Sequence, residues 1–203
     1  MADGARQVFV NCPFDSQYQP LFRAIVFTIL RAGFRARCAL ETDDASETRF
    51  AKIQSIIEGC RYGIHDLSRT GSDGDPPLPR FNMPLELGLF LGAKRYGDPS
   101  QKRKRALILD VEQFRYQRFI SDIAGQDIHA HGGEVGRTIE TVAGWLRTQS
   151  RSSRIPGGRH IAQEFEQFLT LLPEILNARG LHAQEITFGD FSGIATSYIA
   201  TLS

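Results

Sequence analysis

Residues 62–110 read YGIHDLSRTGSDGDPPLPRFNMPLELGLFLGAKRYGDPSQKRKRALILD, in which two apolar runs enclose a helical pattern. The runs are Tyr62–Leu67 and Arg105–Asp110, and both have the length and composition of buried strands. Between them, Asn82–Tyr96 has helical spacing, with Asn82 as the expected N-cap. A polar loop rich in Gly and Pro precedes this helix. Two apolar strands joined through a helix predict neighbouring parallel strands covered by helices.

The same alternation of strands and helices continues on both sides of this stretch. The expected further elements are a strand over Gln7–Asn11, a helix over Tyr18–Ala32, a strand over Phe34–Leu40, a helix capped by Ser46 and closed by Gly59, a weak fifth strand near Asp127–Ala130 and a helix over Glu134–Thr148. This order predicts an α/β fold of the flavodoxin-like type, a doubly wound parallel sheet of four to five strands with a C-terminal helical extension.

The composition changes near residue 150 and suggests a division of the chain. Residues 1–150 are expected to form the α/β domain, and residues 151–160, rich in Arg, Ser and Gly, a linker. Residues 161–203 are expected to form a helical extension, in which Pro173 kinks the first helix. That helix has a broad apolar stripe, which would dock onto its own domain or make the protein a homo-oligomer.

Composition and charge exclude several classes of protein. Hydrophobic residues are 41% and charged residues 23% of the chain, as in globular domains. The 24 Lys+Arg nearly balance the 23 Asp+Glu, which argues against a dedicated binder of nucleic acid. No run is apolar enough to span a membrane and no secretory signal is visible. The three cysteines form no paired motif, so we expect a cytoplasmic protein.

Polar residues follow the predicted strands at the edge where ligands bind in such sheets. Asn11, Glu41, Asp66 and Asp110 stand at or just after the ends of four strands. In an open α/β sheet, ligands bind at the carboxyl ends of the strands, near the point where the strand order reverses. Taken singly, such residues are also typical helix caps, and for Asp110 the two interpretations are equally good.

Glu86 is the candidate catalytic residue. It lies in the first turns of the predicted helix, within the apolar sequence MPLELGLFLGA. A first-turn carboxylate is favoured by the helix dipole, by at most about 1 kcal/mol, and this is the competing interpretation. Gly88 and Gly92 lower the helix propensity, which indicates close packing against a neighbour or a ligand.

Three segments together resemble a known superfamily: VFVNCPFDSQY (8–18), IHDLSR (64–69) and FNMPLELGLFLGA (81–93). The superfamily joins Toll/interleukin-1 receptor (TIR) domains with nucleoside 2-deoxyribosyltransferases. The chain resembles most its TIR-like bacterial members, which are often associated with antiphage defence. The resemblance maps the catalytic glutamate of the family onto Glu86. The sequence departs from the TIR pattern at Asn82-Met83-Pro84, which replaces a Trp-Cys pair, and at Asn11-Cys12, which ends the first strand.

The resemblance implies an enzyme that cleaves the N-glycosidic bond of NAD+, by hydrolysis or with formation of a cyclic ADP-ribose-type signal. NAD+ would be the substrate, with no separate cofactor or metal, and a defence-system protein would be a partner. We expect Asn11 and Asp66 to bind ribose, Phe14 to stack on a base, and Arg37 and Arg69 to bind pyrophosphate. The remaining residues expected around the substrate are Asp15, Ser68 and Asn82. The alternatives are a non-catalytic nucleotide- or signal-binding module and a nucleoside deoxyribosyltransferase or hydrolase.

Other chemistry-bearing residues have simpler interpretations. The basic tract Lys102–Arg105 is expected to be solvated, and the DIHAH sequence at 127–131 is a poor zinc signature. His65, inside a strand, is expected to be a hydrogen-bonded core residue. Ser68 has no evident His–Asp arrangement to activate it, and the cysteines are interpreted as small packed residues.

Overall fold

The computed structural model describes residues 3–41, 44–70, 72–73, 78–79 and 81–202 of the 203-residue chain. Its centre is a five-stranded parallel sheet with the order β2-β1-β3-β6-β7. The strands are β1 (Gln7–Asn11), β2 (Arg35–Arg37), β3 (Tyr62–Asp66), β6 (Arg105–Asp110) and β7 (Ile128–Ala130). The predicted flavodoxin-like α/β fold is thereby confirmed, including the fifth strand.

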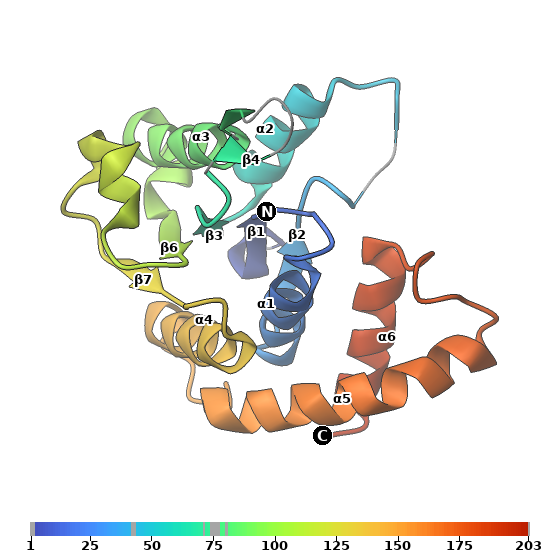
Figure 1. The fold of residues 1–203 in the computed structure, drawn as a ribbon. Helices are drawn as coiled ribbons and strands as arrows, with labels where there is room; N and C mark the ends of the chain where they lie inside the picture. Colours follow the sequence, from blue (N-terminus) through green and yellow to red (C-terminus); the bar gives the residue numbers. More distant parts are fainter. Residues whose placement is uncertain (1–2, 42–43, 71, 74–77, 80, 203) are drawn as a thin grey trace.

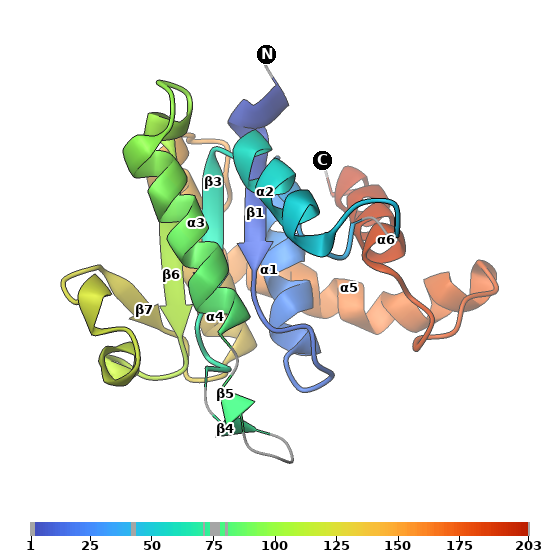
Figure 2. The ribbon, with the colours of Figure 1, turned by 90° about the horizontal axis from the view of Figure 1, so that it is seen from above.

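Helices cover both faces of this sheet (Figure 1). On one face lie α1 (Gln19–Arg31) and α4 (Val135–Ser150), and on the other lie α2 (Arg49–Gly59) and α3 (Asn82–Tyr96). The central strands β1 and β3 are completely buried, and so are the last four residues of β6, which explains why Gln7–Asn11 and Arg105–Asp110 are nearly continuous apolar runs. Figure 2 shows the strands side by side, with the β1–α1 loop and the start of α3 at their carboxyl ends.

The C-terminal extension packs onto the α1 side of the domain. It consists of α5 (Gly158–Ala178), which contains Pro173, and α6 (Phe188–Ala200). Phe27 of α1 contacts Phe165 and Phe168 of α5, with ring centroids 5.2 and 5.3 Å apart. Most of the apolar stripe is therefore buried in the chain's own core, and self-association through it stays a prediction. Neither α5 nor another helix in the described ranges is long and apolar enough to cross a membrane.

Several local features differ from the sequence prediction. The strand expected over 34–40 is shortened to β2, and α2 is capped by Thr48 and not by Ser46, since the Thr48 hydroxyl accepts a hydrogen bond from the Ala51 amide. Asn82 is the first residue of α3, whose N-cap is Phe81. Before α3, two short strands, Ser72–Asp73 and Leu78–Pro79, pair antiparallel where the sequence predicted only a loop. The short elements are η1 (Asp3–Arg6), β4 (Ser72–Asp73), β5 (Leu78–Pro79), η2 (Gln101–Arg103), η3 (Arg115–Arg118) and η4 (Ser121–Ile123).

Candidate functional site

The strand order places the candidate site at the carboxyl ends of β1 and β3. The chain leaves β1 toward β2 on one side and returns through α2 to β3 on the other, so these two strands form the topological switch point. Cys12, just after β1, is buried there. Burial raises the pKa of its thiol well above the ordinary value, and the charges of Asp66, Glu86 and Asp15 add to this effect. The structure thus brings three of the predicted site carboxylates around one point.

Asp66, the last residue of β3, is the centre of a buried hydrogen-bond network. Its carboxylate accepts hydrogen bonds from the Tyr18 hydroxyl (2.6 Å), the Ser68 amide (2.8 Å) and the Ser68 hydroxyl. His131 Nε2 lies 3.0 Å from its second oxygen. Burial alone would raise the pKa of Asp66, but the hydrogen bonds of His131, Ser68 and Tyr18 hold it below the ordinary value. Asp66 is therefore an anion held in place by three other residues, which we call the Asp66 network.

The Asp66 network brings a serine, a histidine and an aspartate together, contrary to the prediction for Ser68. His131 Nε2 lies 2.9 Å from the Ser68 hydroxyl, and its Nδ1 accepts a hydrogen bond from the Gly133 amide at 2.9 Å. In the neutral ring the proton must then be on Nε2, where it is donated to Asp66. His131 has no free nitrogen to take the Ser68 proton, so this arrangement is not a nucleophilic triad.

Glu86 lies on α3 in a cavity of about 200 Å³ between α2 and α3. Arg49, Phe50 and Asn82 are among the residues that line it. Within the described part of the chain, Glu86 makes neither a hydrogen bond nor an ion pair. Burial raises the pKa of Glu86 to about 7, and the charge of Arg49 opposes this rise only in part. Such an unpaired, partly buried carboxyl group is a property of functional sites.

Gly88 and Gly92 do not have the role expected for them. Among the described residues, no atom of another element lies within 4 Å of where a Cβ would stand at either glycine. Close packing therefore does not require them. Close packing does require a glycine at other positions, such as Gly63 in β3, where a Cβ would come within 2.6 Å of His65 and 2.8 Å of Phe90.

The raised pKa of Glu86 gives a prediction about stability. The pKa of this carboxyl group is 4.5 in the unfolded chain and about 7 in the folded protein. The unfolded chain therefore loses its proton first, and the free energy of unfolding decreases as the pH rises from 4.5 to 7. Glu86→Gln removes this charge, so we expect it to increase the free energy of unfolding at pH 8 by about 1 to 3 kcal/mol. Urea unfolding at pH 8 and pH 4.5 measures this. A gain that is equal at both pH values, or a loss at pH 8, would contradict it.

The predicted substrate residues fall into separate groups. Asn82 shares the cavity of Glu86. Arg69 contacts Asp15 at 3.4 Å and also Gln17, which ties the loop after β3 to the loop after β1. Phe14 is half-buried, with its ring edge-to-face against Phe22 at 5.3 Å. Asp15, Phe14 and Arg69 are therefore at the predicted edge, but mainly in contact with neighbouring protein groups.

Asn11 and Asp66 are not open to a ligand, which changes the role expected for them. The Asn11 amide group donates to the Met83 carbonyl at 2.8 Å and lies 3.0 Å from His65 Nδ1. Both hydrogens of this amide are thus used to join β1 to β3 and to the first turn of α3. Asp66 is 0% exposed and occupied by its own network. Instead of binding ribose directly, the two residues position the loops and the helix that surround Glu86.

Arg37 is the last residue of β2, but its guanidinium group reaches toward the other end of the sheet. Its guanidinium pairs with both carboxylate oxygens of Glu41 and reaches Gln7, the first residue of β1. It therefore points toward the amino ends of the strands and away from the edge where a pyrophosphate was expected. Its contacts with Glu41 and Gln7 hold the side chain in this direction, which the alternation of a strand does not predict, because alternation selects only the face of the sheet.

Two other interpretations from the sequence also change. Lys104, expected to be solvated, is buried and donates to the carbonyls of Ile57 and Cys60 at the end of α2, and burial lowers its pKa to about 8. His65 is a core residue as expected, and burial lowers its pKa to about 3. Its Nε2 has no hydrogen-bond partner in the described ranges. Neither residue lines the cavity of Glu86.

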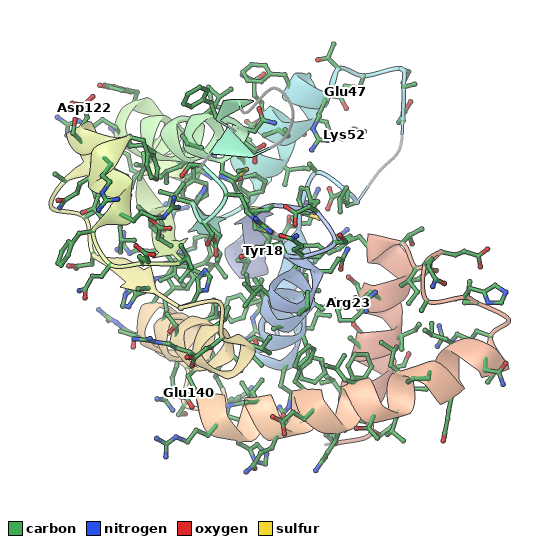
Figure 3. The ribbon with its side chains drawn as sticks, viewed as in Figure 1. Tyr18, Arg23, Glu47, Lys52, Asp122 and Glu140 are labelled. Carbon is green, nitrogen blue, oxygen red and sulfur yellow. The ribbon has the colours of Figure 1, made fainter. Side chains whose placement is uncertain are left out.

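Tyr18 and His131 are the site residues that sequence reasoning missed. Figure 3 shows Tyr18 at the start of α1, next to the sheet. Its sequence position before a helix suggested only a helix boundary, and its contact with Asp66 spans 48 residues. His131 follows the weak fifth strand, and its position just beyond a strand end was the available signal. Among the described residues, no group of three or more His, Cys, Asp or Glu side chains is arranged to hold a metal ion.

Comparison of the chain with protein-family models, with curated proteins and with solved structures finds no match. The assignment of a function therefore depends on the geometry of the site and on the chemistry of its residues.

Proposed function

We propose that the protein cleaves the N-glycosidic bond of NAD+ with Glu86 as the catalytic residue. The observation that supports this most is the unpaired Glu86 carboxyl group in a cavity beside the switch point of the sheet. A protein gains nothing in stability from such a group, because burial without a partner disfavours the charged form. The reaction class is taken from the expectation raised by the sequence, in which residues 81–93 resemble the catalytic segment of TIR-like enzymes.

The chemistry requires a fixed negative charge and little else. When the bond from ribose C1′ to the nicotinamide nitrogen breaks, its electron pair neutralises the cationic ring, so the leaving group needs no proton. The ribose acquires oxocarbenium character, which a nearby carboxylate stabilises. Water then adds to C1′ and loses a proton, giving ADP-ribose and nicotinamide. Glu86 would stabilise the cation directly or bond to C1′ before water does.

The pH dependence of the reaction tests this role. Since the carboxylate is the active form, we expect kcat/KM for NAD+ to rise with pH, to reach half its maximum near pH 7 and to be constant above pH 8. Release of nicotinamide, followed by chromatography between pH 5.5 and 9, measures this profile. A rate that falls above pH 7 would instead show that the protonated acid is required and would refute the role of Glu86 proposed here.

The same assay separates the two alternative functions. A nucleoside deoxyribosyltransferase must protonate a neutral leaving base and would exchange bases between deoxynucleosides while leaving NAD+ intact. A non-catalytic module would bind a nucleotide without turnover. The complete engagement of Asn11 and Asp66 with the protein favours this second alternative. Tight binding of NAD+ with no nicotinamide release at any pH would establish it and exclude the enzyme.

A further inference from the structure

A second and larger cavity, of about 560 Å³, lies between the α/β domain and the C-terminal extension. Its walls are formed by α1, by the described residues Ala39, Leu40, Asp44 and Glu47 between β2 and α2, by the start of α2, and by the segment from Ile186 into α6. We call it the α6 cavity. Its volume is within the range of small-ligand sites. Without the extension this space would be open to solvent on one side. The extension therefore closes a cavity in addition to burying its own apolar stripe.

One wall of the α6 cavity is aromatic. Phe22 of α1 and Phe191 of α6 are buried, and Phe188, the first residue of α6, is half-buried beside them. The rings of Phe22 and Phe188 are 6.0 Å apart and inclined by 34°. Thr187 fixes the start of α6 through a capping box with Asp190, which holds Phe188 in position. A flat base can stack on such a wall.

Arg23 supplies a positive charge next to this wall. Its guanidinium lies 5.6 Å from the centroid of the Phe191 ring, and it has no ion pair within the described ranges of the chain. Burial lowers its pKa, so the surroundings disfavour its charge. In Figure 3, Arg23 lies on the side of α1 that faces α6. A half-buried guanidinium without a carboxylate partner is a ready site for a phosphate group, which it can bind through two parallel hydrogen bonds.

The opposite wall has charges of both signs. Arg49 and Lys52 come from the first turn of α2, and Asp44 and Glu47 from the segment before it, as Figure 3 shows for Glu47 and Lys52. The charge of Lys52 lowers the pKa of Asp44, after two hydrogen bonds from Ser46 that have the larger effect. The cavity therefore has only a small excess of positive charge. That balance suits a ligand with one or two phosphate groups and an aromatic base, and does not suit a polyanion.

Arg49 connects this cavity to the candidate active site, since it lines both the α6 cavity and the cavity of Glu86. We propose that the α6 cavity binds the adenosine diphosphate part of a nucleotide. The base would stack on Phe188 in the aromatic wall, and the phosphates would lie between Arg23 and Arg49. The direction in which the rest of the ligand extends, past Arg49 to Glu86, rests on the proposed function. The binding of adenosine diphosphate does not.

Calorimetric titration of the full chain with ADP tests this assignment. We expect ADP to bind, and Arg23→Gln and Phe188→Ala each to weaken the affinity at least tenfold, because each removes one of the two recognition elements. Arg147→Gln, which changes an exposed arginine on α4, is the matched control and should bind as the unchanged protein does. Circular dichroism of each variant verifies the fold. Arg23→Lys, which keeps the charge but not the paired donors, should be intermediate if Arg23→Gln is weakened.

The outcomes separate this inference from the proposed function. Absence of ADP binding at millimolar concentration, or equal affinity of Arg23→Gln and the unchanged protein, would overturn the inference even if NAD+ is cleaved. ADP binding that depends on Arg23 would support it even if NAD+ is not cleaved. Glu86→Gln should bind ADP with unchanged affinity, because Glu86 lies in the other cavity. A tenfold loss in that variant would contradict the placement of the two subsites.

Discussion

Glu86→Gln is expected to reduce the rate of NAD+ cleavage by at least about 1,000-fold, which corresponds to about 4 kcal/mol of transition-state stabilisation. Glutamine has the same size and shape but no charge, so the cavity between α2 and α3 keeps its form while the developing positive charge on the ribose loses its counter-charge. Since the carboxyl group has no hydrogen-bond or ion-pair partner in the described ranges, the substitution breaks no interaction that the fold needs. The variant should therefore be folded and inactive.

The control for this variant is Glu166→Gln, which changes an exposed glutamate on α5 and should leave kcat and KM unaltered. Initial rates of nicotinamide release at pH 8 compare the two variants with the unchanged protein. Glu86→Asp, which retracts the charge by one methylene, should recover part of the activity, because the electrostatic effect decreases with distance. Equal rates for Glu86→Gln and the unchanged protein would remove Glu86 from the mechanism.

The fold was predictable because its signals are local. Gln7–Asn11 and Arg105–Asp110 are apolar, short and bounded by breakers, and they form strands with these bounds. The helix over Asn82–Tyr96 also has the predicted bounds. One detail that failed is the exact residue that caps α2. Thr48 and not Ser46 is the cap, and the sequence does not decide between them, because both precede the apolar positions of the helix and both can accept a hydrogen bond.

The location of the candidate site was predictable from the sequence, but the roles of its single residues were less so. A parallel sheet brings the carboxyl ends of all its strands to one edge, so residues at strand ends must gather there. Sequence does not show which of them are exposed to a ligand and which are bound to each other. Asp66 and Asn11 are bound, whereas Glu86 is not. Tyr18, one of the residues that bind Asp66, is separated from it by 48 residues, and no sequence pattern predicts this contact.

Asp66→Asn is expected to lower the free energy of unfolding at pH 7 by about 3 to 5 kcal/mol, a large part of the stability of a domain of this size. The carboxylate is completely buried and accepts hydrogen bonds through both oxygens. An asparagine offers one acceptor and places an amide donor opposite groups that are themselves donors, so at least one of them loses its partner inside the protein. Asp122→Asn, at an exposed position of η4, is the matched control and should change stability by less than about 0.5 kcal/mol.

The pH dependence of this loss follows from the direction of the Asp66 pKa. The network holds that pKa below the ordinary value of 3.8, so the folded state binds fewer protons than the unfolded state as the pH falls through this range. The stabilisation is therefore fully present above about pH 5 and is lost progressively as the pH falls from the pKa of the unfolded state through the lower pKa of the folded state. Urea unfolding of Asp66→Asn and of the unchanged protein should give a constant difference in the free energy of unfolding from pH 8 to pH 5 and a smaller difference at pH 3.5.

Tyr18→Phe, which removes a single donor, should lower the free energy of unfolding by about 1 to 2 kcal/mol, because it leaves Ser68 and His131 in place. A stability of Asp66→Asn equal to that of the Asp122→Asn control would mean that the network does not fix the loops around Glu86.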